Sequence, residues 1–264
     1  MKAKLEVAAV GVLQAHASLS PHLGKRFVRQ VRSSSLDVVT AALTFVDEAF
    51  CKGYPKTHDG LLPDDVLPLV GVVAEKCQCL PSLPRTPVLL IHAELQRQSQ
   101  LVNDALSELE EARNEGGGMS DEDEFDVTYT EDDLKLLMPA LGLFKTVKAL
   151  IKKVSQTVKK HGKADTVENI QQLEELSDIC ARISPCIDEY SEVLYPPIEP
   201  EQVRAKSSVI IQLSNDIHST LIGKHYSNDE EVNQWREFLL KALKHNETQV
   251  EVALTGQELS KMLV

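Results

Sequence analysis

The chain has 264 residues, of which 42% are hydrophobic and 26% charged, a composition typical of a soluble globular protein rather than a disordered or fibrous one. Aromatic residues make up only 5%, which favours packed aliphatic helices over a β-sandwich or barrel. The formal net charge of −12 excludes a generally basic nucleic-acid binder, and no apolar run reaches the length of about eighteen residues that predicts a membrane span.

The negative charge is concentrated in one segment. Residues 114–133 hold 9 acidic and no basic side chains, whereas residues 1–113 have a net charge of −1 and residues 134–264 a net charge of −2. We therefore predict two nearly neutral bodies, 1–113 and 129–264, joined by an acidic flexible linker over residues 114–128. Repulsion between its carboxylates would keep such a linker extended.

The first body has the periodicity of helices. Apolar residues recur at intervals of three and four over residues 25–50, and a denser apolar run over residues 66–80 predicts a buried central helix. The next helix is expected to begin after Thr86, whose hydroxyl can cap it, with Pro87 in the first helical position. Asn114 and the glycines after it end this helix.

The second body begins with a long predicted helix over Glu131–His161. Leu137, Phe144 and Ile151 recur every seven residues, which predicts an apolar seam for neighbouring helices. Gly162 ends the helix.

A further helix is expected up to Leu194, kinked at Pro185 because proline lacks a backbone N–H. Two more helices are predicted over residues 200–222 and 229–254. No segment alternates with the period of a strand, so the predicted fold class is all-α, with antiparallel up-and-down helical bundles.

Catalytic and metal chemistry find little support in the sequence. The motifs HExxH, GxSxG, GxGxxG and GxxxxGK[ST] are absent, and the eight histidines are scattered. Cys77 and Cys79 form half of a zinc motif at the wrong spacing, and no second half follows. We expect no enzymatic activity, no metal site and no cofactor.

The acidic linker does not match a calcium-binding loop. Asp121 and Asp123 fit the first spacing, but Phe125 occupies a ligand position and no glycine follows it. Ser120 is a phosphorylation candidate, because the acidic residues directly after it suit a kinase that recognises downstream acids.

Charged residues of the long helix are the candidate partner-binding set. A stripe of basic residues runs along it, and a cluster of acidic residues lies at its positive end after the capping residue Thr130. The set comprises Lys145, Lys148, Lys152, Lys159, Glu131, Asp132 and Asp133. The stripe could receive an acidic partner, an anionic lipid surface or the linker, and a solvated face is the simpler interpretation. A single helix without interleaved aromatic residues is a poor reader of nucleic acid, so no direct nucleic-acid binding is expected.

Three sequence blocks together resemble the cyclin-D-binding protein family. They are YTEDDLKLLMPAL, KTVKALIKKV and ELSDICARISPCIDEYSEVLYPP, which follow one another between Tyr129 and Pro197. Weaker similarity extends upstream through KRFVRQVRSSSLDVVTAALTF. The family carries additional N-terminal helices before the region that matches Val12–Phe50, so the resemblance implies a first bundle short of some family helices.

The resemblance implies a non-enzymatic regulator that is both cytoplasmic and nuclear and restrains cell-cycle progression and transcription. Its implied partners are D-type cyclins, helix-loop-helix transcription factors and a signalling adaptor. The implied fold is similar to the bundles of talin and vinculin. The alternative function is a cytoskeletal adaptor of the talin or vinculin kind.

Overall fold

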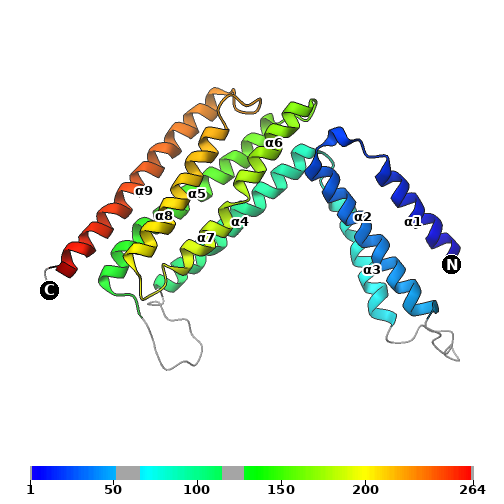
Figure 1. The fold of residues 1–264 in the computed structure, drawn as a ribbon, viewed down its shortest axis with the longest axis horizontal. Coiled ribbons are helices and arrows are strands. Elements are labelled where there is room, and N and C mark those ends of the chain that lie inside the picture. Colours follow the sequence, from blue (N-terminus) through cyan, green and yellow to red (C-terminus); the bar gives the residue numbers. More distant parts are fainter. Residues whose placement is uncertain (1, 52–65, 115–127, 263–264) are drawn as a thin grey trace. The chain divides into compact units, whose positions relative to one another are not determined.

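The structure, a computed structural model, describes residues 2–51, 66–114 and 128–262, and every regular element in these ranges is helical (Figure 1). The α-helices are α1 (Lys2–Ala17), α2 (Lys25–Val46), α3 (Leu67–Cys79), α4 (Pro87–Asn114), α5 (Glu131–His161), α6 (Val167–Cys180), α7 (Ile183–Glu192), α8 (Pro200–Thr220) and α9 (Glu230–Met262). Short helical turns η1 (Pro21–Leu23), η2 (Asp47–Cys51) and η4 (Leu80–Ser82) accompany α2 and α3. The predicted all-α fold class is confirmed.

Contacts divide the chain into two compact units. Unit 1 comprises Met1–Leu90 with Ala164–Ile170, and unit 2 comprises Ile91–Lys163 with Gln171–Val264. The division falls within α4 rather than in the predicted linker 114–128, because most of α4 is bonded to α5 and α7 of unit 2. Residues 115–127, and with them the phosphorylation candidate Ser120, lie outside the described residues.

The long helix α5 lies at the centre of unit 2. Its buried residues come from most of its circumference, and Leu137, Phe144 and Ile151 are fully enclosed. The helices α8 and α9 both pack against α5, and the Phe144 ring stacks on the Tyr190 ring of α7 with centroids 5.5 Å apart. The apolar seam, whose residues recur every seven positions, is therefore packed inside the bundle.

A capping box sets the start of α5. The Asp133 N–H donates to Thr130 Oγ1 (3.1 Å), and the Thr130 N–H donates to Asp133 Oδ2 (2.9 Å). Each side chain thus satisfies a backbone N–H that has no acceptor within the helix. The predicted range Glu131–His161 and the predicted cap are confirmed.

The segment before Leu194 forms two helices instead of one kinked helix. Because α6 ends at Cys180 and α7 begins at Ile183, the prediction of a kink at Pro185 is wrong in its position. The ring of a proline clashes with the carbonyl four residues earlier, here that of Ala181, so the helix breaks ahead of the proline. Pro185 then lies in the first turn of α7, where an N–H is not needed.

Unit 1 is built around α2, against which α1 and α3 both pack. Only Phe27, Val39 and Ala42 of α2 are buried, and α3 has no buried residue. The helix predicted over residues 66–80 therefore forms, but the prediction that it is buried is wrong. Among the described residues, α2 is the main neighbour of α3, so one helix supplies most of its contacts there.

Candidate functional site

The predicted lysine stripe follows the exposed face of α5. Lys145, Lys152 and Lys159 are exposed, and Lys148 is half-buried. These positions recur at intervals of three, four and seven residues, so their side chains emerge along one line of the helix surface. The stripe is a solvent-facing surface of unit 2.

Two lysines of the stripe bond to α4. Lys145 Nζ lies 2.7 Å from Glu110 Oε1, and this hydrogen bond lowers the pKa of the Glu110 carboxyl. Lys148 Nζ donates to Asn103 Oδ1 at 2.6 Å. Lys145 thus forms an ion pair with a carboxylate, whereas the hydrogen-bond partner of Lys148 is a neutral amide, and its charge acts on Glu110 only at longer range.

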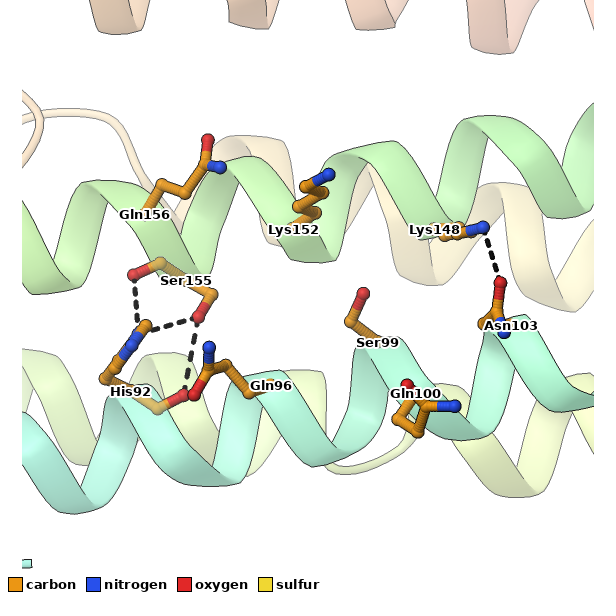
Figure 2. Close-up of a pocket in the computed structure, with 9 residues that line it drawn as sticks. All are labelled: His92, Gln96, Ser99, Gln100, Asn103, Lys148, Lys152, Ser155 and Gln156. Carbon is orange, nitrogen blue, oxygen red and sulfur yellow. Dashed lines mark hydrogen bonds between the residues drawn. The ribbon is translucent and has the colours of Figure 1, made fainter.

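A groove of about 400 Å³ opens between α4 and α5 (Figure 2). The two helices are antiparallel, because His92, near the start of α4, bonds to Ser155, near the end of α5. From α4 the groove is lined by His92, Gln96, Ser99, Gln100 and Asn103, and from α5 by Lys148, Lys152, Ser155 and Gln156. All of these side chains are polar, and none carries a negative charge.

A buried hydrogen-bonded pair closes one end of the groove. The His92 Nδ1 atom lies 2.8 Å from Ser155 Oγ, and the Ser155 hydroxyl donates to the His92 carbonyl oxygen at 3.3 Å. A serine next to a histidine can act as a nucleophile in other proteins, but Ser155 is only 3% exposed and its hydroxyl faces a carbonyl. The pair therefore joins the two helices rather than presenting a reactive group.

The groove walls offer hydrogen bonds to a negatively charged ligand. Gln100 is already engaged, since its Nε2 donates to Asp104 Oδ1 at 2.6 Å. In the part of the chain that the structure describes, the side chains of Gln96, Gln156 and Lys152 have no hydrogen-bond or ion-pair partner. Amides and ammonium groups of this kind suit carboxylate or phosphate oxygens.

The acidic members of the predicted set lie at the other end of α5. Asp133 is buried in the capping box, and Asp132 Oδ1 accepts a hydrogen bond from Lys135 Nζ at 2.7 Å. Glu131 is exposed. At about 1.5 Å per residue, Asp132 and Lys148 are separated by roughly 24 Å along the helix axis, so the structure does not bring the acidic and basic residues into one site.

The α4 wall of the groove was not predicted from the sequence. His92, Gln96, Ser99 and Asn103 recur at helical spacing beside the apolar stripe of α4, and this polar line is the available signal. The sequence alone does not show whether this polar line faces another helix or the solvent, because exposed helix faces have polar lines of the same kind. Only the pairing of α4 with α5 makes it one wall of a groove.

Two further observations concern the described residues. No group of three or more histidine, cysteine or acidic side chains in them is arranged to hold a metal ion. None of their helices combines the length and the apolar character that crossing a bilayer requires.

Comparisons with known proteins assign the chain to a family. The family model described as Grap2 and cyclin-D-interacting, N-terminal matches residues 4–115, and its C-terminal counterpart matches residues 110–221. A Xenopus laevis protein named Cyclin-D1-binding protein 1 homolog is 28% identical over 87% of this chain and 70% of its own length. The Bos taurus Cyclin-D1-binding protein 1 is 25% identical over 88% of this chain and 71% of its own length.

The two family models overlap at residues 110–115 and together match residues 4–221. The sequence resemblance to a cyclin-D-binding family is confirmed, and the family is one of interaction proteins rather than a known enzyme family. The chain belongs to the Grap2- and cyclin-D-interacting family.

Proposed function

We propose that this protein is a non-enzymatic regulator that binds D-type cyclins and thereby restrains cell-cycle progression. Membership of the family carries the proposal, because the matched vertebrate relatives are named for binding cyclin D1. A binding role also suits the α4–α5 groove, whose polar walls offer hydrogen bonds. The expected place of action is both the cytoplasm and the nucleus.

The proposed partners also include helix-loop-helix transcription factors and a signalling adaptor. A partner helix cannot reach the seam of α5 in the folded protein, because Leu137, Phe144 and Ile151 are fully buried. Exposing such side chains costs about 2–5 kcal/mol each, judged from large-to-small core substitutions. We therefore expect partners to bind the outer surface of unit 2, so that α5 keeps its protection from hydrogen exchange in the complex.

The test uses purified proteins. The full chain is immobilised and exposed to a D-type cyclin, alone and with its kinase, with an A-type cyclin as the control for specificity. We expect D-type cyclin to bind at least about tenfold more tightly than A-type cyclin, a difference of about 1.4 kcal/mol. We also expect phosphorylation of a retinoblastoma-protein substrate by the cyclin-D-dependent kinase to fall as the protein is added.

The opposite outcome is equally defined. If neither form of the D-type cyclin binds, the proposed function is wrong. Co-sedimentation with actin filaments in place of cyclin binding would instead favour the cytoskeletal adaptor.

A further inference from the structure

We propose that the groove between α4 and α5 is a docking site for a short acidic segment of a protein partner, held by Lys148 and Lys152. The inference rests on the proposed function in one respect, that the ligand belongs to a protein. It adds the surface, the chemistry of the ligand and the residues that hold it.

The charges of the α5 lysines identify the ligand as an anion. Lys145 and Lys160 already have carboxylate partners of this chain, at 2.7 Å from Glu110 and 2.7 Å from Glu231 respectively. Among the described residues, Lys148 and Lys152 face the groove with no carboxylate at ion-pair distance, and Lys148 acts on Glu110 only at longer range. Cations that lack an internal counterion are the ones free to pair with an external carboxylate.

The neutral lining favours a peptide over an isolated ion. Gln96 and Gln156 each carry a donor and an acceptor on one amide, which can pair with the N–H and C=O groups of a peptide backbone. Figure 2 shows Ser99 pointing from α4 toward α5, in the interval between the two bonded pairs. A small anion would use the lysines and leave these neutral groups unpaired.

A hydrogen-bonded pair between α4 and α5 bounds the groove at each end. His92 bonds to Ser155 at one end, and Asn103 bonds to Lys148 at the other, as the dashed lines in Figure 2 mark. The eleven residue-to-residue steps from His92 to Asn103 cover roughly 16 Å of helix, at about 1.5 Å per step. This length accommodates about five residues of extended chain, at roughly 3.3 Å each.

The spacing of the two lysines sets the spacing of the acids. Lys148 and Lys152 are one helical turn apart, about 6 Å along the axis. Side chains on the same face of an extended peptide are separated by nearly 7 Å, so acids at alternate positions can meet both ammonium groups. A bilayer surface is a poorer fit, because a slot between two helices does not admit a broad surface.

The experiment measures binding of a defined probe to the full chain. The probe is a fluorescein-labelled Glu-Ser-Glu-Ser-Glu peptide, followed by fluorescence anisotropy at low salt, and Gln-Ser-Gln-Ser-Gln is its neutral control. We expect the acidic peptide to bind and the neutral peptide not to bind. The double variant Lys148→Gln, Lys152→Gln should weaken binding by about tenfold or more.

The matched control removes two charges outside the groove. Lys145→Gln with Lys160→Gln changes the net charge equally but affects lysines that are already paired, so its affinity for the peptide should stay within about twofold of the parent. Asn103→Asp is nearly isosteric and places a carboxylate beside Lys148. We expect it to weaken peptide binding without a change in helicity by circular dichroism.

Several results would overturn the inference. Equal weakening by the two double variants would indicate a diffuse charge effect, and full competition by millimolar inorganic phosphate would indicate a small-anion site. Binding to phosphatidylserine vesicles that depends on the same two lysines would indicate a membrane surface. If D-type cyclin binds and the peptide does not, the groove proposal fails and the proposed function stands. If the peptide binds and no cyclin does, the proposed function fails and the groove proposal stands.

Discussion

Helices α3 and α5 show that apolar residues are buried to very different extents in the two units. The sequence of α3, LPLVGVVAEKCQC, is the more apolar of the two, yet α3 has no buried residue. The helix α5 carries charges in its first turns and from Lys145 onward, and it buries Asp133, Thr146 and Ser155 among its apolar residues. In these two helices burial thus follows the number of neighbouring helices rather than the hydrophobicity of the segment. Among the described residues, the buried polar side chains all lie in unit 2, which must satisfy them in its interior.

The sharpest test of this contrast compares two truncations. Phe144→Ala in α5 removes a ring that is 0% exposed, so we expect the free energy of unfolding of unit 2 to fall by about 3–5 kcal/mol. Val70→Ala in α3 affects a side chain that is 41% exposed, and we expect a loss of about 0.5 kcal/mol or less.

Each unit needs its own measurement. Trp235, the single tryptophan, lies in unit 2, so its fluorescence during denaturation reports on that unit, while far-ultraviolet circular dichroism reports on both. If Val70→Ala proved as costly as Phe144→Ala, the exposed face of α3 would be covered in solution and the contrast between the units would disappear.

A second test concerns a buried histidine of unit 2. His218 of α8 is 3% exposed, and burial, assisted by the nearby Arg236 cation, lowers its pKa to about 4. Because the unfolded chain binds the proton more readily, stability should fall as the pH drops from about 6.5 to about 4, by up to about 3 kcal/mol. His218→Leu should reduce this dependence, measured as the free energy of unfolding at several pH values. An unchanged slope would mean that other groups set the acid sensitivity.

A third test concerns the contact of α5 with α9. Asn246 Nδ2 donates to Gly142 O (3.2 Å) and to Thr146 Oγ1 (2.8 Å), and a methyl group on Gly142 would lie 2.5 Å from Asn246 Oδ1. Asn246→Ala should therefore cost about 1–2 kcal/mol.

The effect of a substitution at Gly142 on stability should depend on whether the Asn246 side chain is present. Gly142→Ala should destabilise the parent, because it displaces Asn246. In the Asn246→Ala background it should stabilise by up to about 1 kcal/mol, since alanine favours a helix more than glycine does. A double-mutant cycle of unfolding free energies measures the coupling, and additive effects would mean that the two residues do not interact in solution.

The smallest expected effect is at the cap of α5. Thr130→Ala removes the acceptor for the Asp133 N–H, so we expect a loss of about 1 kcal/mol, measured by Trp235 fluorescence during denaturation. Thr130→Ser retains the hydroxyl and should stay close to the parent. An equal loss in both variants would assign the effect to packing of the threonine methyl group.

Features coded by adjacent residues were predictable, and features that depend on neighbouring helices were not. The bounds of α5 follow from Thr130 before it and Gly162 after it, and the start of α4 follows from Thr86, whose Oγ1 accepts from the Leu89 N–H at 3.2 Å. The exposure of α3 could not be predicted, because an apolar run does not reveal how many helices surround it. The same holds for the groove, of which the sequence indicated the α5 lysines but not the opposite wall.

The course of α4 also affects how the protein can be divided into fragments. The two family models meet at residues 110–115, where α4 ends. The sequence suggests this place as a domain boundary, but the compact units divide earlier, within α4. Leu95, Val102, Leu106 and Leu109 of α4 are buried in the intact chain. A fragment that stops at residue 113 would carry this apolar stripe without the rest of unit 2, and one that starts at residue 129 would lack the part of α4 that belongs to that unit. Both fragments would therefore tend to aggregate, so binding surfaces are better mapped by point substitutions in the whole chain.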